Sequence, residues 1–359
     1  MSPMKGSPSP ARTVRIGLVG AGQHGIRYAR HIVQDVAEAS LVALTRRDQE
    51  AGRAQAAELG CEYVPKVSEL VHRSDIDAIV IVTPPAAHLD PALRALAAGK
   101  AVLIEKPMVA SVHEAEELRL AAAGAPQPLM VAHTLRYNAV LRALRAKLPS
   151  LGRLVQVRMS QRLEPSSLAW QREHQAAGAG SILLTGVHLF DAVRWLFGDE
   201  VAAVYCRWGR ILNPAHEDFF AASVALARTG IHADLEVSKY TQSRSCRIEV
   251  VGESGQLFGD YWNHRLIFVS GREERFEPLP PELLTVEETV RDFCRSLLAG
   301  QPVASTVDDG LRTLEIVEAC YASARTDSVI TLPVVEAPPA PVGARPPVPA
   351  GARMGDRPR

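Results

Sequence analysis

Residues 13–25 read TVRIGLVGAGQHG, an apolar run that leads into glycines spaced as G-x-G-x-x-G. The run is typical of a buried parallel strand, and the helix-like stretch IRYARHIVQDVAEA follows it. This order predicts a Rossmann-type dinucleotide site, with the pyrophosphate at the N-terminus of the new helix. Gly20 would make the tight turn, Gly22 would admit the phosphates and Gly25 would let helix and strand pack, with Gln23 and His24 beside the cofactor. A tight turn without a ligand is the alternative.

The composition of the 359-residue chain indicates a globular protein of two domains. Apolar residues make up 47% and charged residues 22%, and the formal net charge of zero favours neither nucleic acid nor an anionic membrane as partner. The five cysteines are scattered without a C-x-x-C, which favours free thiols in a reducing cytoplasm. No signal-like segment or apolar run of roughly 18 residues occurs. We therefore expect a cytoplasmic protein without a metal site, a nucleic-acid partner or a membrane span.

Strand-like and helix-like patterns alternate from residue 14 to about residue 131, which predicts a doubly wound parallel sheet. After residue 154 the pattern changes to long strands with alternating apolar and polar residues, typical of half-buried antiparallel strands. We therefore expect a dinucleotide-binding domain over 13–133 and a second, α+β domain over 134–333, whose last helix packs back near the first. Residues 1–12 and the Pro-rich tail 334–359 are expected to be disordered.

The end of the second expected strand decides between the two nicotinamide cofactors. A site for NAD usually places a carboxylate about 20 residues beyond the glycines, bonded to the ribose. Here Thr45 is followed by Arg46 and Arg47, and Arg46 lies 21 residues after Gly25. A guanidinium binds a 2′-phosphate in a fork, so the sequence favours NADP over NAD. In the alternative, the two arginines form a solvated edge and Asp48 binds the ribose.

Further motifs give the chain a resemblance to a known family. They are Thr83-Pro84 with His88, Glu105-Lys106-Pro107, Arg136-Tyr137-Asn138, Gly186-x-His188-x-x-Asp191 and Gly252-x-x-Gly255. With the glycine turn, these motifs resemble the Gfo/Idh/MocA oxidoreductases over most of residues 13–333. The resemblance implies a Rossmann domain, a C-terminal domain with a large open sheet that commonly carries the oligomer contact, and substrates among sugars, polyols and their keto forms.

The resemblance assigns the central catalytic role to Lys106. A cation near a substrate carbonyl stabilises developing negative charge and can supply the proton during hydride transfer. Lys106 and His188 are therefore the expected catalytic pair, and Lys106–Pro107 is a candidate cis peptide bond. A surface lysine after a strand is the alternative. The cofactor contacts expected beyond the glycine turn are Thr45, Arg46, Arg47, Thr83, Pro84, His88, Glu105, Lys106 and Arg136. Two of these residues have a structural alternative: His88 can hold the loop that contains it, and Arg136 can secure the domain junction.

One position departs from the family pattern. Many members carry Asp-x-Gly-x-His, whereas this chain has Leu184 in place of the aspartate before His188. Lys106 and His188 alone can suffice, Tyr137 or Thr185 can substitute, or the chemistry is lost. Leu184 also gives an apolar wall, which favours a less hydroxylated substrate such as a deoxysugar or a cyclic ketone. His188 could instead be a core residue or bond to Asp191.

The sequence thus predicts an NAD(P)-dependent oxidoreductase acting on a secondary alcohol or ketone of a sugar-like molecule. A non-catalytic cofactor-binding sensor and an NAD-dependent glycoside hydrolase are the alternatives. A half-buried sheet needs a cover, so we expect a homodimer or homotetramer through that sheet. The expected substrate contacts are Tyr137, Trp170, Arg172, Leu184 and Thr185. For Trp170 and Arg172, a packing role is an equally good interpretation.

Overall fold

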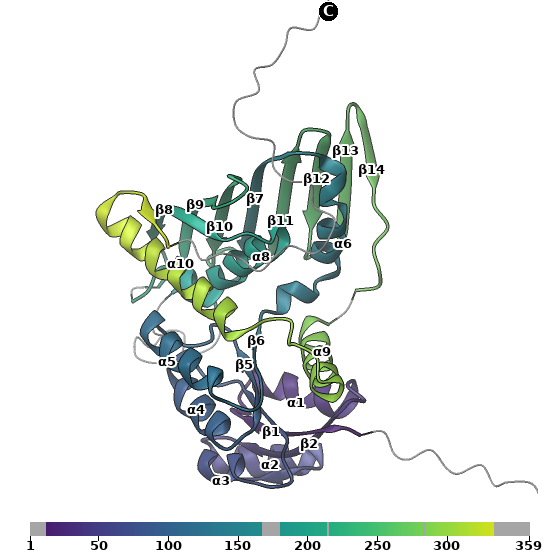
Figure 1. Cartoon of the computed structure of the whole chain (residues 1–359), viewed down its shortest axis with the longest axis vertical. Helices are drawn as coiled ribbons and strands as arrows, with labels where there is room; N and C mark the ends of the chain where they lie inside the picture. The colour runs from purple at the N-terminus through teal and green to yellow at the C-terminus, as the bar shows by residue number, and fades with distance from the viewer. Residues whose placement is uncertain (1–11, 167–179, 214, 283, 334–359) are drawn as a thin grey trace, which may run out of the picture.

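The computed structural model describes residues 12–166, 180–213, 215–282 and 284–333. Two sheets form its framework, one at the lower end of Figure 1 and one at the upper end, with helices between them. The lower sheet is parallel and comes from the N-terminal part of the chain, and the upper sheet is mostly antiparallel. This arrangement confirms the predicted fold class.

The first sheet has the strand order β3-β2-β1-β4-β5-β6, and its strands are parallel. Chain order reverses between β1 and β4, and ligands of such sheets bind outside the carboxyl ends of the strands at that point. The central strands are continuous apolar runs, so they are buried on both faces. The elements of this part are β1 (Val14–Val19), α1 (Gly25–Gln34), β2 (Ala39–Thr45), α2 (Gln49–Leu59), β3 (Glu62–Tyr63), α3 (Val67–Val71), β4 (Ala78–Ile81), η1 (Pro85–Ala87), α4 (Leu89–Ala97), β5 (Ala101–Glu105), α5 (Val112–Ala123) and β6 (Leu129–Ala132).

The glycine turn between β1 and α1 uses its three glycines for different physical reasons. Gly20 has a φ of +94°, which side chains rarely adopt. A Cβ at Gly25 would lie 2.0 Å from the carbonyl oxygen of Gly20, so only glycine fits there. A Cβ at Gly22 would meet no heavy atom of the described chain within 4 Å. The backbone at Gly22 is therefore open on the side where a pyrophosphate is expected.

The second sheet has the order β14-β13-β12-β11-β7-β10-β9-β8-β15. Strands β7 and β10 pair in parallel, and the other neighbours are antiparallel. The strands are β7 (Leu154–Arg162), β8 (Val201–Gly209), β9 (Phe219–Leu226), β10 (His232–Ser238), β11 (Ser245–Gly252), β12 (Gly255–Asp260), β13 (Arg265–Ser270), β14 (Glu273–Phe276) and β15 (Ile330–Thr331). The other elements are η2 (Thr134–Tyr137), α6 (Ala139–Lys147), η3 (Leu148–Leu151), the π-helix η5 (Ile182–Gly186), α8 (Val187–Phe197), α9 (Thr285–Ala299) and α10 (Val307–Thr326).

The two halves are held together by helices from the end of the chain. α9 returns to the first sheet and packs on α1, where Phe293 and Val290 are fully buried. α10 packs against both α5 and β8, so it touches both halves. One continuous apolar core runs from the α4 and α5 side of the first sheet to the helix-covered face of the second sheet. The halves therefore share a core and not merely a linker.

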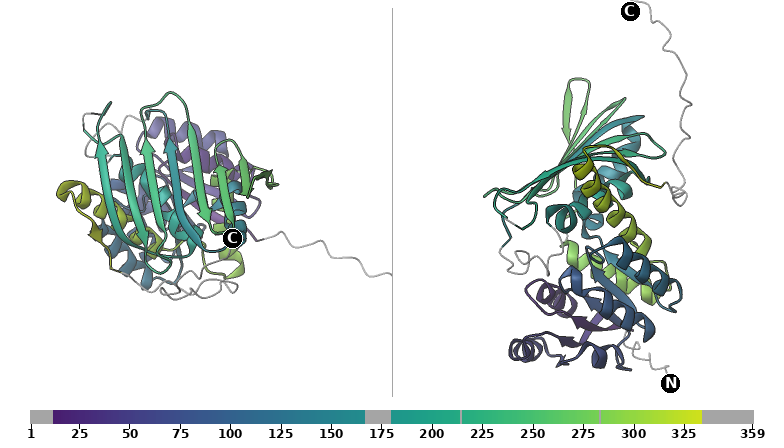
Figure 2. Two further views of the ribbon diagram at one scale, coloured as in Figure 1. Left: turned by 90° about the horizontal axis from the view of Figure 1, so that it is seen from above. Right: turned by 90° about the vertical axis from the view of Figure 1, so that its left-hand side faces the viewer.

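The other face of the second sheet is not covered by any helix of the described chain, as the left view of Figure 2 shows. Alternate residues on this face are polar or small, such as Arg162, Ala221 and Glu236. Arg162 donates to Glu236 across the strands at 2.6 Å. These pairs allow the face to contact either solvent or another polar surface.

Alanine substitutions at Gly25 and Gly22 should distinguish a glycine that has no room for a Cβ from one whose surroundings are open. Gly25→Ala should lower the free energy of unfolding by about 1–3 kcal/mol, because the new methyl group meets a main-chain oxygen. Gly22→Ala, the matched control, should change it by less than about 0.5 kcal/mol. Urea denaturation followed by circular dichroism measures both. Equal stability of the two variants would contradict this account of the turn.

Candidate active site

The carboxyl ends of β1 and β5 are joined by a buried carboxylate. Oε1 of Glu105, the last residue of β5, accepts hydrogen bonds from His24 Nε2 at 2.8 Å and from the Tyr28 hydroxyl at 2.7 Å. Burial raises the pKa of Glu105, but the bond from His24, the charge of Lys106 and the bond from Tyr28 outweigh it and hold the pKa well below its usual range. Glu105 is thus an ionised anchor for the glycine turn. Glu105 is among the residues predicted to contact the cofactor, whereas Tyr28, one helical turn beyond His24, was not predicted to lie at this site.

Lys106 follows directly and points at the second half of the molecule. The Lys106–Pro107 bond is cis, as hypothesised. Nζ of Lys106 donates to the main-chain oxygen of Leu184 at 2.9 Å. Burial lowers the pKa of Lys106, and the adjacent Glu105 opposes this shift. A carbonyl thus partners the lysine from the position where the family pattern carries an aspartate.

His188 stands near Lys106 as a neutral imidazole. Burial lowers its pKa well below the usual range, and the charge of Lys106 lowers it further. Nδ1 of His188 is buried and has no hydrogen-bond partner among the described residues. The alternative bond from His188 to Asp191 is not formed, because the Asp191 carboxylate is bound by Arg136. A neutral imidazole beside an ammonium group can accept a proton at neutral pH.

The residues that precede His188, Ile182–Gly186, form a π-helix. π-turns are rare and are frequent at functional sites. Leu184 lies in this turn, is only 7% exposed and lines a cavity with its apolar side chain. Thr185 is buried in the same turn. Trp170 and Arg172 lie outside the described residues.

The cavity beside Leu184 has a volume of about 440 Å³ and contains residues that the sequence analysis missed. Ser181 and Lys239 both line it. Burial lowers the pKa of Lys239 to about 8, and the charge of Lys106 contributes. The neighbouring Glu217 accepts bonds from the Ile182 amide and from a tyrosine hydroxyl. Lys239 follows directly after the alternating strand β10, which was its only sequence signal.

Arg136 and Tyr137 are both engaged by partners at the junction between the two halves. The Arg136 guanidinium binds both oxygens of Asp191, lies 2.9 Å from Asp309 and donates to a main-chain oxygen on the loop before α10. The Tyr137 hydroxyl donates to Asp292 of α9 at 2.6 Å. A buried charge requires such partners. These groups therefore fasten the domain junction, which is the structural role that the sequence left open for this motif.

His88 likewise serves the loops. It is 1% exposed, and its ring nitrogens face the main-chain oxygens of Thr83, Pro107 and Met108 at 2.7–3.1 Å. The imidazole thus joins the loop after β4 to the loop after β5. The expectation that it holds its loop agrees with this geometry, whereas a direct cofactor contact does not.

The end of β2 lies against the glycine turn. The oxygen of Thr45 accepts from the amides of Gly20 and Ala21, both at 3.1 Å. Nη1 of Arg46 donates to the oxygen of Ala21 at 3.3 Å, which brings the guanidinium onto the turn. Arg47 is exposed. Asp48 caps α2: Oδ1 of its carboxylate accepts a hydrogen bond from the Ala51 amide at 3.1 Å.

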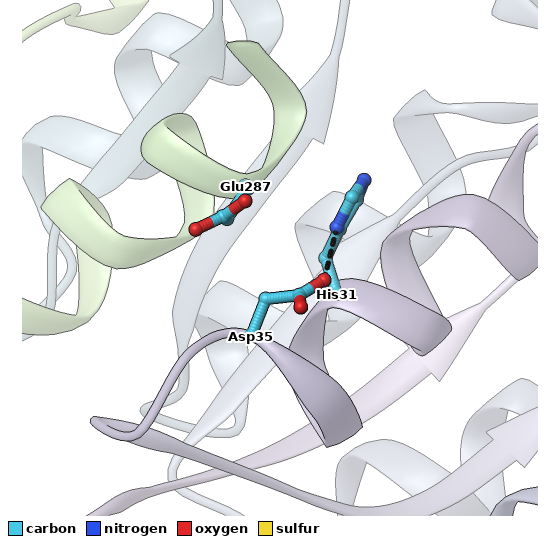
Figure 3. A group of neighbouring side chains, drawn as sticks. All are labelled: His31, Asp35 and Glu287. Atoms are coloured by element: carbon cyan, nitrogen blue, oxygen red, sulfur yellow. Dashed lines mark hydrogen bonds and ion pairs between the residues drawn. The ribbon is translucent and has the colours of Figure 1, made fainter. Parts of the chain in front are cut away.

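One group of described residues has metal-ligand chemistry, at the seam between α1 and α9. His31, Asp35 and Glu287 bring their ligating atoms within 4.8 Å of one another (Figure 3). His31 is hydrogen-bonded to Asp35 at 2.7 Å, and Arg291 pairs with Glu287 and donates to the main-chain oxygen of Asp35. The arginine supplies the positive charge there, so the group acts as an ion-pair network between two helices. Within the described residues, no helix is both long and apolar enough to cross a bilayer.

Comparisons with known proteins agree with this geometry. Residues 14–133 match the model of the oxidoreductase family with an NAD-binding Rossmann fold, and residues 149–258 match the Gfo/Idh/MocA C-terminal domain. Inositol 2-dehydrogenase 1 of Saccharopolyspora erythraea is 30% identical over 272 residues, which cover 68% of this chain and 73% of that protein.

Two Bacillus subtilis relatives differ in the cofactor that they are named for. The scyllo-inositol 2-dehydrogenase (NAD(+)) is 26% identical, covering 90% of this chain and 98% of that protein. The scyllo-inositol 2-dehydrogenase (NADP(+)) is 22% identical, covering 89% and 96%. Among solved structures, an oxidoreductase domain protein from Kribbella flavida has a TM-score of 0.82 at 24% identity, covering 90% of this chain and all of that one, which shows the shared fold.

Proposed function

The chain belongs to the Gfo/Idh/MocA family of oxidoreductases, and on that premise we propose that Lys106 and His188 handle the proton when it oxidises or reduces a sugar or polyol. The family assignment makes it an NAD(P)-dependent oxidoreductase of sugar-like alcohols. The observation that carries the catalytic proposal is the hydrogen bond from Nζ of Lys106, directly after β5, to the Leu184 oxygen in the turn that leads into His188.

The nicotinamide cofactor fits the residues at the first switch point. The open backbone at Gly22 and the N-terminus of α1, which no described side chain caps, suit a pyrophosphate. When bound, the cofactor supplies or accepts the hydride. The chain's own contribution is a rigid turn, because ionised Glu105 holds His24 and Tyr28 and thereby fixes the start of α1.

NADP is the cofactor that the end of β2 favours. The Arg46 guanidinium lies on the turn, where the 2′-phosphate of NADP would come close to a fork of donors. Asp48 caps α2 through its carboxylate, which accepts a hydrogen bond from the Ala51 amide. NAD remains the alternative, and the named Bacillus subtilis relatives include both types.

A fluorescence titration with NADPH and NADH tests the cofactor preference. Arg46→Ala should weaken NADPH binding by about tenfold or more, since charge-assisted bonds contribute about 1.5–3 kcal/mol. NADH affinity should change little. Arg53→Ala, which removes a neighbouring guanidinium on α2, is the matched control. An unchanged NADPH affinity in Arg46→Ala would contradict the 2′-phosphate argument.

At the substrate, Lys106 and His188 divide two tasks. The Lys106 ammonium, held by the Leu184 oxygen, is placed to stabilise negative charge on a substrate oxygen. Neutral His188 can take the proton of a substrate hydroxyl or relay it from Lys106. The Leu184 side chain offers no hydrogen bond, which favours a substrate lacking a hydroxyl at that wall, such as a deoxysugar or a cyclic ketone.

A second function, a cofactor-binding sensor without catalysis, is favoured by one feature. Leu184 stands where many family members carry the relay aspartate. Against it, Lys106 and His188 are both present, and ligand sensing does not require either group. Glycoside hydrolysis through a transient keto sugar would use the same pair, and would appear as product formation without net change of the cofactor.

Turnover assays on inositols, aldoses and cyclic ketones separate these functions. Lys106→Ala should lower kcat/KM by about 100-fold or more with cofactor affinity nearly unchanged, since such groups supply roughly 10²–10⁴ in rate. His188→Asn should show a similar loss. Lys66→Ala, on the exposed end before α3, serves as the control and should retain activity. Tight cofactor binding with no turnover of any substrate by the wild-type protein would instead favour the sensor.

We further propose that two copies associate through the uncovered face of the second sheet. Two observations support this proposal. No described helix covers this large face, and charged residues on it pair across neighbouring strands, which suits a polar interface. Two such faces related by a two-fold axis would present the same residues to each other.

Light scattering during gel filtration tests this association. The wild-type chain should elute as a dimer or tetramer, and Ala221→Arg should dissociate it, because a long cation would be inserted in the middle of that face. Leu120→Arg, on the exposed side of α5, should leave the assembly intact. A monomeric wild-type chain, or an Ala221→Arg variant with unchanged mass, would contradict the proposal.

A further inference from the structure

A second pocket lies away from Lys106, His188 and the glycine turn. It has a volume of about 520 Å³ and lies where η2, α6, α8 and α9 meet. Its walls come from both halves of the molecule, because α9 packs on α1 while α6 and α8 belong to the second half. The residues that matter here are Arg136, Tyr137, Arg142, Arg145, Trp195 and Asp292.

Two arginines of this pocket are held by aromatic rings and not by carboxylates. The Arg145 guanidinium lies over the ring of Trp195 at 4.6 Å, and that of Arg142 over the ring of Tyr137 at 4.8 Å. Within the described residues, neither has an oxygen of Asp or Glu within 4.0 Å. Nε of Arg142 donates to the main-chain oxygen of Arg136 at 2.8 Å. Stacking leaves the other N–H donors at the edge of each guanidinium open to a further partner.

The charges around this pair leave an excess of positive charge. Arg136 is matched by Asp191 and Asp309. Asp292, the one carboxylate on the described pocket wall, accepts a hydrogen bond from the Tyr137 hydroxyl, and it forms no ion pair with Arg142 or Arg145 among the described residues. Burial lowers the pKa of Arg145, and the charge of Arg136 adds to this, so an anion beside it would relieve an electrostatic cost.

We propose that this pocket binds a small anionic molecule through a phosphate or carboxylate group held by Arg142 and Arg145. The two guanidinium groups are three residues apart on α6, so they lie on one face of the helix and can converge on one group of oxygens. The volume exceeds that of one oxyanion, so the rest of the ligand would lie against Trp195. An occupant would contact both halves at once, next to the Arg136 guanidinium that grips α8. The inference rests on this geometry and not on the proposed reaction.

Isothermal titration calorimetry with inorganic phosphate, pyrophosphate and citrate tests the site. The protein is first saturated with whichever nicotinamide cofactor it binds more tightly, so that the glycine turn cannot take up the probe, and ionic strength is held constant with potassium chloride. We expect saturable binding of at least one probe. Arg142→Gln combined with Arg145→Gln should weaken it at least about tenfold, or 1.4 kcal/mol. Circular dichroism checks that the variant is folded.

Arg272→Gln, on the exposed turn between β13 and β14, is the matched control and should leave binding unchanged. Binding of the phosphates alone identifies a phosphoryl group as the recognised part, and binding of citrate alone identifies a carboxylate. In the wild type, quenching of tryptophan fluorescence that is lost in Trp195→Phe would place the probe in this pocket. No binding of any probe, or equal binding by the double variant, would overturn the proposal.

Discussion

The geometry of the site depends on one buried carboxylate, Glu105. It ends a fully buried strand, and both His24 of the glycine turn and Tyr28 of the following helix donate to the same oxygen. An unpaired charge at this depth would cost several kcal/mol, so the three groups must stay together. The next residue along the chain is Lys106. One carboxylate therefore fixes the turn expected to hold the cofactor and the backbone from which Lys106, the lysine proposed as catalytic, extends.

A second constraint positions the other half of the site. Arg136 joins Asp191 of α8 to Asp309 of α10, and it lies in the short η2 turn directly after the first sheet. Because α8 also carries His188 three residues before Asp191, this ion pair sets the distance between the imidazole and the end of β5. The energetic cost of desolvating these charges is balanced only when both domains are docked. The arrangement makes the junction part of the catalytic geometry.

At position 184, where many family members carry an aspartate, the main chain of this protein supplies the oxygen that contacts Lys106. An aspartate there would offer a side-chain oxygen to substrate and lysine. In this chain the π-turn presents the carbonyl of Leu184 to Lys106 instead, while the leucine side chain lines the cavity. The lysine is thus held without a second carboxylate nearby. Lys239, whose pKa burial lowers to about 8, lines the same cavity together with Glu217 and Asp218.

The sequence by itself determined the parallel sheet, the glycine turn and the position of Lys106, because apolar runs, glycine spacing and a Lys-Pro pair are local signals. It also located the second sheet, since alternation has a period of two along the chain. Only the tertiary structure decided what Arg136 and Tyr137 bind, that residues 182–186 form a π-helix, and that Lys239 and Tyr28 reach the site. Their partners lie far away in sequence: Arg136 is 55 residues from Asp191, and Tyr137 is 155 residues from Asp292. The direction of a side chain that must satisfy a buried charge or hydroxyl is set by such distant partners, and no local pattern encodes it.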